Sequence, residues 1–160
     1  MNRRSLLTSL GALGVTGLAG CSGLLNEDVP AGSLRFENRD SLPHVIGMSV
    51  VDVGSDSETD QTGYNVTGEA TVRPGQRELS ASQSVGPGET QTFRDVFTES
   101  VYYLVEFTLD GEHPEDGGTI PFNPSPPDRE YGQVLGGVVY ASGEFSWQLS
   151  STDNLGRFDR

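Results

Sequence analysis

The stretch that decides the fold reads Val-Tyr-Tyr-Leu-Val-Glu-Phe-Thr-Leu and occupies residues 101–109. Successive side chains of a β-strand point to opposite faces, so every second residue lies on the same face. One face of this stretch is wholly apolar and consists of Val101, Tyr103, Val105, Phe107 and Leu109. The other face carries Glu106 and Thr108 among its residues. The stretch therefore predicts a strand with one face in a hydrophobic core.

The same alternation recurs along the chain. Residues 144–150 predict a second clear strand, with Phe145, Trp147 and Leu149 pointing inward. Further strands are expected at residues 34–38, 44–53, 69–72, 78–84, 90–97, 119–122 and 134–141. Turn residues separate them, and helical periodicity is nearly absent. This pattern predicts an all-β, antiparallel two-sheet sandwich of about 7–9 strands. Residues 54–63 and 123–132 are expected to be long loops.

The chain is strongly acidic. Its 23 Asp and Glu residues face only 10 basic residues, all of them arginine, and the formal net charge is −13. Such a surface repels nucleic acid. Low hydrophobicity with high charge is also typical of disordered chains, but the patterned apolar residues favour a folded body. An acidic, lysine-free composition resembles the proteins of halophilic archaea, where salt screens the repulsion.

Residues 1–21 are similar to a lipoprotein signal peptide. Arg3 and Arg4 precede an apolar stretch of residues 6–19, which is too short for a membrane span. The paired arginines resemble a twin-arginine export signal, the alternative being an ordinary charged leader. Residues 18–21 read Leu-Ala-Gly-Cys and resemble the lipobox, whose cysteine receives the lipid. We therefore expect Cys21 to anchor the mature protein to the cell membrane, facing the outside.

The remainder divides into three parts. Residues 22–32 are rich in turn formers and predict a flexible tether. Residues 33–150 are expected to form the β-sandwich, and residues 151–160 a polar C-terminal tail. Cys21 is the only cysteine, so no disulfide can form within the chain.

A run of turn residues carries a resemblance to known sandwiches. Residues 85–90 read Val-Gly-Pro-Gly-Glu-Thr and lead into Phe93 and Phe97. This resembles immunoglobulin-like and cupredoxin-like β-sandwiches, in which a Pro-Gly-Glu turn opens a strand. Together with residues 38–44, it resembles small secreted lipoproteins of halophilic archaea. The resemblance implies an architecture and no particular activity.

A metal site is the sharpest functional alternative. His44 lies roughly where the cupredoxin resemblance places the first histidine ligand, and His113 offers a second nitrogen. Blue copper also needs a thiolate, whereas residues 103–109 contain no cysteine and Cys21 is expected to carry lipid. His44 and His113 are therefore weak candidates for copper or zinc. The simpler interpretation makes them a strand residue and a solvated turn residue, and we expect no cofactor.

Three further features could bind or be modified. Asp52, Asp56, Glu58 and Asp60 concentrate carboxylates in residues 52–60, which would suit calcium, but the spacing is not that of an EF-hand and a solvated loop is favoured. Asn65 begins an N-glycosylation sequon. Three tyrosines, Tyr102, Tyr131 and Tyr140, are candidates for an exposed aromatic patch or for completing the core.

No catalytic motif is present in the sequence. It contains neither a Gly-x-Ser-x-Gly nor a His-Glu-x-x-His pattern. The sequence therefore predicts a non-enzymatic, lipid-anchored interaction or accessory module of a halophile, with a protein or carbohydrate partner. The alternative is a surface lipoprotein that binds a small ligand or a metal such as Cu, Zn or Ca.

Overall fold

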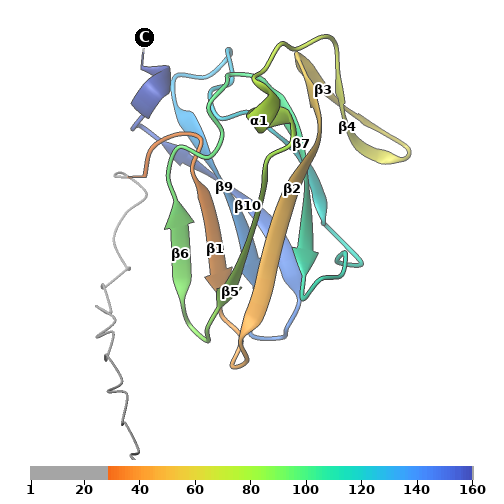
Figure 1. The fold of residues 1–160 in the computed structure, drawn as a ribbon, viewed down its shortest axis with the longest axis vertical. Coiled ribbons are helices and arrows are strands. Elements are labelled where there is room, and N and C mark those ends of the chain that lie inside the picture. The colour runs from red at the N-terminus through yellow and green to blue at the C-terminus, as the bar shows by residue number, and fades with distance from the viewer. Residues whose placement is uncertain (1–28, 160) are drawn as a thin grey trace, which may run out of the picture.

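Two four-stranded sheets face each other in the computed structural model, which describes residues 29–159 (Figure 1). The first sheet has the order β10-β9-β1-β6 and the second the order β5-β2-β7-β8, while β3 and β4 form a separate hairpin. The strands are β1 (Leu34–Asn38), β2 (His44–Gly54), β3 (Asp56–Asp60), β4 (Gly63–Thr67), β5 (Ser80–Val85), β6 (Thr90–Phe93), β7 (Tyr102–Leu109), β8 (Thr119–Phe122), β9 (Gly132–Val139) and β10 (Phe145–Thr152). The short helices are α1 (Pro74–Arg77) and the 3-10 turn η2 (Gly156–Phe158). The all-β sandwich expected from the sequence is confirmed.

One strand pair departs from the expected antiparallel arrangement. β1 pairs in parallel with β9, starting with Leu34 opposite Leu135, and antiparallel with β6. Parallel neighbours need a long connection between them, and the seven strands between β1 and β9 in the chain provide it. The first strand is thereby inserted between two strands that come much later in the sequence.

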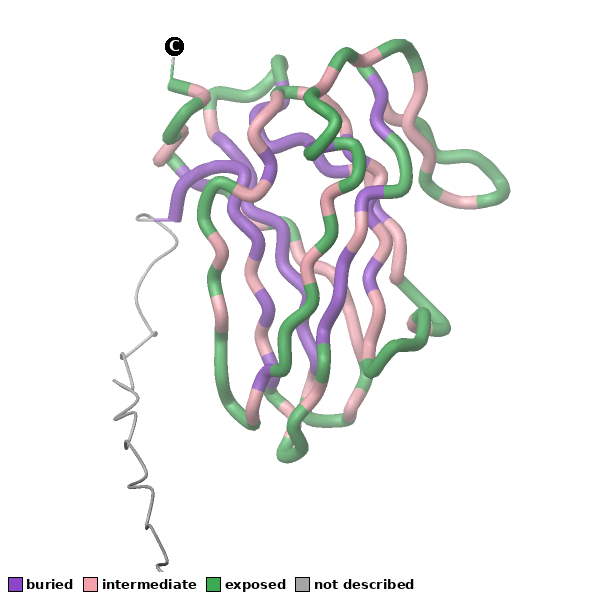
Figure 2. The backbone as a smooth tube through the Cα atoms, viewed as in Figure 1, coloured by how far each residue is buried: buried purple, intermediate pink, exposed green. Residues whose placement is uncertain are grey.

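The core lies between the two sheets (Figure 2). Tyr103, Val105 and Phe107 of β7 are fully buried, as their alternation predicted. Phe97 packs edge-on against Tyr103 and Phe122, with ring centroids 5.0 and 4.8 Å apart. Such aromatic contacts add to the stabilisation from burial alone.

Several expected strand bounds change in the structure. Residues 69–72 form no strand, and the strand expected at residues 90–97 ends at Phe93. The chain leaves the sheet there because the Val96 and Phe97 amides donate to the carbonyl of Gly32 instead. Leu149 was expected to point inward but is 40% exposed.

The acidic segment expected to be a loop at residues 54–63 is part of a hairpin. β2 continues to Gly54, and β3 pairs with β4 from Asp56 opposite Thr67 to Asp60 opposite Gly63. Polar, exposed side chains fill β3, so apolar alternation gave no strand signal there. Asp60 closes the turn by accepting the Thr62 amide.

The two ends of the sandwich differ in how the chain uses them (Figure 1). The proximal end, where the chain enters, contains residues 29–33, 123–131 and 153–159. The distal end contains the turns at residues 39–43, 86–89 and 140–144, and the loop of residues 110–118 begins there. Strand β2, with 11 residues, runs from the distal end to the proximal end.

Residues at both boundaries expected for the domain belong to the fold. Ala31 is 1% exposed and its amide donates to the carbonyl of Asn154, while the Thr152 hydroxyl donates to the carbonyl of Val29. Residues 29–32 of the tether expected at residues 22–32 are therefore part of the folded body, and β10 extends into the tail expected at residues 151–160.

The expected signal peptide lies outside the described residues, including Arg3, Arg4 and Cys21. Within residues 29–159, no helix has the length and apolar character needed to cross a membrane.

Candidate functional site

His44 is held between two carboxylates at the distal end. Its Nε2 lies 2.8 Å from Asp40 Oδ2, and its Nδ1 lies 2.7 Å from Asp110 Oδ2. The hydrogen bond with Asp40, followed by that with Asp110, raises the pKa of His44. The pKa of Asp40 is lowered chiefly by His44, and that of Asp110 chiefly by the amide of Val45. An imidazolium that donates both N–H groups fits this arrangement.

This arrangement makes His44 a cross-link between the turn after β1 and the end of β7. A metal ion would need a deprotonated ring nitrogen, but both nitrogens of His44 face carboxylate oxygens. His113, the other weak candidate, is exposed in the loop of residues 110–118. Across residues 29–159, no group of three or more His, Cys, Asp or Glu side chains could hold a metal ion.

Buried Asn38 fixes the turn that carries Asp40 and His44. Its Nδ2 donates to the carbonyls of Leu42 and Val85, at 2.7 and 3.0 Å, and its Oδ1 accepts the Asp40 amide at 2.9 Å. An amide that is fully buried and fully bonded specifies one local conformation. Asn38 therefore holds the turn of residues 39–43 in the position that brings Asp40 beside His44.

The loop of residues 110–118 starts with a tight hairpin turn. Asp110 and Gly111 have φ values of 53° and 84°, and Leu109 and Glu112 exchange both backbone hydrogen bonds. Positive φ at both central residues is the type I′ pattern, for which Asp-Gly is a preferred pair. Because Asp110 also accepts the Val45 amide at 2.8 Å, the base of the loop is fixed to β2.

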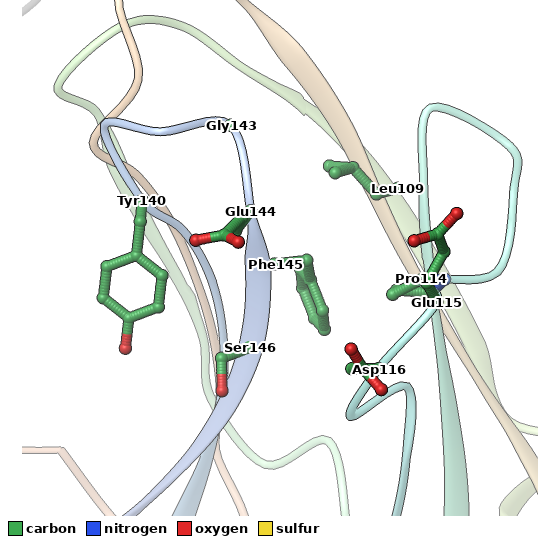
Figure 3. Close-up of a pocket in the computed structure, with 9 residues that line it drawn as sticks. All are labelled: Leu109, Pro114, Glu115, Asp116, Tyr140, Gly143, Glu144, Phe145 and Ser146. Atoms are coloured by element: carbon green, nitrogen blue, oxygen red, sulfur yellow. The ribbon is translucent and has the colours of Figure 1, made fainter.

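A first cavity of about 460 Å³ opens between this loop and the turn from β9 to β10 (Figure 3). Pro114, Glu115 and Asp116 line it on the loop side, and Tyr140, Glu144 and Phe145 line it on the other. Figure 3 shows the Phe145 ring between Glu144 and Asp116. Phe107 packs against Phe145 with ring centroids 5.2 Å apart, so the core supports this aromatic wall.

A second cavity, also of about 460 Å³, is lined in part by the same loop. Its polar lining consists of Thr62, Tyr64, Glu106, His113, Glu115 and Thr119. Pro114 and Glu115 line both cavities. The two cavities therefore adjoin, and we refer to them together as the groove.

Tyr64 is the most exposed aromatic residue of the groove. It is 41% exposed, and its ring packs edge-on against Trp147 with centroids 6.2 Å apart and planes at 79°. A Cβ at Gly117 would lie 3.8 Å from the Trp147 indole. The loop of residues 110–118 therefore lies directly beside the Trp147 side chain. Trp147, the only tryptophan of the chain, thus contacts the residues that form the second cavity.

The three tyrosines considered as one aromatic patch are divided between the two ends. Tyr140 lines the first cavity, whereas Tyr102 begins β7 and Tyr131 precedes β9 at the proximal end. Sequence reasoning missed Tyr64, because it lies in the hairpin that was expected to be partly loop. The alternation of Tyr64 and Val66 between two glycines was the available signal.

Three of the four acidic residues considered as ligands lie along the hairpin. Asp56, Glu58 and Asp60 point from β3, and the pKa of Asp60 is lowered chiefly by the hydroxyl of Thr62. Asp52 lies in β2 and its Oδ1 accepts the following amide. Asn65, which begins the sequon, lies in β4, and its Nδ2 donates to Asp60 at 3.2 Å.

Comparison of this chain with protein-family models, with curated proteins and with solved structures finds no match.

Proposed function

We propose that this protein is a non-enzymatic binding module, displayed outside a salt-adapted cell by lipid on Cys21, and that the groove is its binding site. The observation that carries the proposal is the position of the groove. The turn from β9 to β10, which lines its first cavity, lies at the distal end, away from the point where the chain enters the sandwich (Figure 1). A display module needs this separation between its anchor and its binding site.

Chain length supports this orientation. Seven residues, 22–28, separate Cys21 from Val29, and a fully extended chain of that length spans roughly 25 Å. Strand β2 has 11 residues, which corresponds to a sandwich height of about 36 Å. The tether is therefore shorter than the sandwich, so the distal end cannot turn to face the membrane. The groove stays directed outward or sideways.

We propose an immunoglobulin-like type for the sandwich. The chain crosses repeatedly between two four-stranded sheets, and the connections gather at two opposite ends, as in that class of fold. Binding loops of such sandwiches lie at one end of a rigid framework. The bonds of Asn38 and His44 supply that rigidity at the distal end.

Two variants, each with one cysteine added to Cys21, test the display proposal. Lipidation of Cys21 would leave the added thiol as the only free one. Ser142→Cys places it on an exposed distal turn, and Asp128→Cys on an exposed proximal loop. We expect a membrane-impermeant maleimide to label both variants on intact cells. We also expect energy transfer to a membrane dye to be stronger from residue 128.

Cys21→Ser serves as the anchor control and should release the protein into the medium. Retention of this variant in the membrane fraction would refute the lipid anchor. Equal energy transfer from residues 142 and 128 would refute the orientation, and labelling only after cell lysis would refute the outside location.

A further inference from the structure

We propose that the groove binds a neutral oligosaccharide, with one sugar ring stacked on Tyr64 in the second cavity and the chain continuing into the first. This deepens the proposed function by naming the ligand chemistry of the same groove. It rests on the groove being the binding site of the module.

The aromatic surface is the first argument. Tyr64 leaves 41% of its surface exposed although its ring is supported edge-on by Trp147. A supported ring is a rigid apolar surface that loses little conformational entropy on binding. The C–H face of a pyranose is a flat apolar surface of matching kind, so stacking on Tyr64 removes apolar area from water.

The hydrogen-bonding groups around the ring are the second argument. Glu106 and Glu115 are acceptors when ionised, and Thr62 and Thr119 can donate and accept. A ligand that supplies many hydroxyl donors beside an apolar face satisfies this combination. Aromatic walls with a few convergent polar groups are typical of specific small-ligand sites.

Charge selects among sugars. No arginine lines either cavity in the described part of the chain, and the sequence has no lysine. Glu106, Glu115, Asp116 and Glu144 line the groove. Uronic or sulfated sugars would place like charges beside these carboxylates, which costs binding energy. The ligand is therefore neutral.

The two lining residues that the cavities share set the expected length of the ligand. Both cavities have volumes of about 460 Å³ and share Pro114 and Glu115. The first cavity repeats the chemistry of the second, with Phe145 and Tyr140 beside carboxylates. Two adjoining sites of like character fit consecutive units of one chain better than a single small molecule.

A cationic peptide is the competing ligand, because the groove is acidic. The dependence of binding on salt concentration distinguishes the two classes of ligand. At about 1 M the Debye length is roughly 3 Å, so attraction between exposed charges is largely screened. Stacking and short hydrogen bonds persist at that salt concentration. A site that works in brine is therefore better matched to a neutral, hydroxyl-rich ligand.

The only tryptophan gives a direct readout, because Trp147 supports the Tyr64 ring. We would titrate the exported full-length protein, in mild detergent and about 1 M salt, with maltohexaose, cellohexaose, chitohexaose and mannohexaose. Hexagalacturonate and an arginine hexapeptide are the charged probes. We expect at least one neutral hexasaccharide to change the Trp147 fluorescence saturably, with Kd between about 1 μM and about 1 mM.

Matched variants identify the residue responsible. Tyr64→Ala should weaken binding roughly tenfold or more, whereas Tyr64→Phe should keep it within about threefold. Tyr131→Ala removes a comparable tyrosine at the proximal end and should leave the affinity unchanged. Glu115→Gln keeps an acceptor but removes a charge, so a neutral ligand should lose less than about tenfold. Near-ultraviolet circular dichroism verifies that each variant is folded.

The outcomes are separable from those of the display test. Absence of saturable binding by every neutral hexasaccharide up to about 10 mM would overturn the ligand class, even for a protein that is anchored and displayed as proposed. Binding of the arginine peptide alone, abolished by Glu115→Gln, would assign the groove to a cationic partner instead. If the folded Tyr64→Ala variant binds the hexasaccharide with wild-type affinity, the proposed stacking on Tyr64 is refuted.

Discussion

Replacing His44 by alanine should destabilise the domain and remove one component of its pH dependence. The imidazole makes two bonds to carboxylates, at 2.8 Å to Asp40 and 2.7 Å to Asp110, and its side chain is 12% exposed. Hydrogen bonds to charged groups are each worth about 1.5–3 kcal/mol when buried. Asp110 is 51% exposed, so solvent screening reduces its share. We expect His44→Ala to lose about 2 kcal/mol of unfolding free energy in total.

The pH dependence has a definite sign. The pKa of His44 is raised above 6.5 in the folded protein, so its contribution is complete below the unfolded pKa and is lost as pH rises through the folded one. The pKa values of Asp40 and Asp110 are lowered below 3.8, so their contribution is lost as pH falls. The three residues therefore stabilise the fold most at pH values above the unfolded pKa of the two aspartates and below the unfolded pKa of His44.

Thermal unfolding followed by circular dichroism, in constant molar salt, measures the effect. For a domain of about 130 residues, the loss in His44→Ala corresponds to a Tm lower by about 6–10 °C near pH 6. The difference between variant and wild type should shrink toward pH 9. His113→Ala is the matched control, because His113 is exposed, and should leave Tm nearly unchanged. A difference of less than about 2 °C at pH 6, or one that grows with pH, would refute the reasoning.

Three other perturbations test separate parts of the structure. Tyr103→Phe should lower the free energy of unfolding, measured by chemical denaturation, by about 1–2 kcal/mol, because the buried hydroxyl donates to Gln76 and accepts the Glu99 amide. Burial raises the pKa of Tyr103 to about 12. Absorbance near 295 nm should therefore show one tyrosine that resists ionisation below that pH and that is missing in the variant. Gly137→Ala should lower Tm by several degrees, because the added Cβ would lie 3.0 Å from the Phe107 ring and 3.1 Å from the Phe145 ring; an unchanged Tm would show that these rings move freely. Lowering the salt concentration from about 1 M to about 0.01 M should unfold the domain. The Debye length grows from roughly 3 to 30 Å over this range, so the repulsion among 23 acidic residues is no longer screened. A thermal melt that is the same at both salt concentrations would contradict this prediction.

Apolar alternation predicted the elements that build the core. Residues 101–109 anticipated β7, including the burial of Tyr103, Val105 and Phe107, because a period of two in apolar residues is a local property. The hairpin of β3 and β4 escaped the same reasoning, since the residues of β3 have low strand propensity and lie at the surface. Its pairing depends on the partner strand and on the turn closed by Asp60.

The candidate site was less accessible from the sequence, because its residues are distant in the chain. Asp110 lies 66 residues from His44, its hydrogen-bond partner, and the cross-link depends on the order of strands in the second sheet. The groove similarly combines Tyr64, Glu106 and Phe145 from three different strands. Composition could indicate an acidic surface, but not where aromatic rings meet carboxylates.

The His44 cluster and the groove are physically connected, although they lie on different parts of the surface. Asp110 bonds to His44 through Oδ2 and to the Val45 amide through Oδ1, and it is also the first residue of the loop that lines both cavities. Its positive φ, together with that of Gly111, sets the direction in which the loop leaves β7. Loss of the His44 imidazolium would remove the hydrogen bond to Asp110 Oδ2 and would leave the carboxylates of Asp40 and Asp110 without the cation between them. We therefore expect His44→Ala to alter the position of Pro114 and Glu115, and with it the shape of the groove, although His44 lines neither cavity.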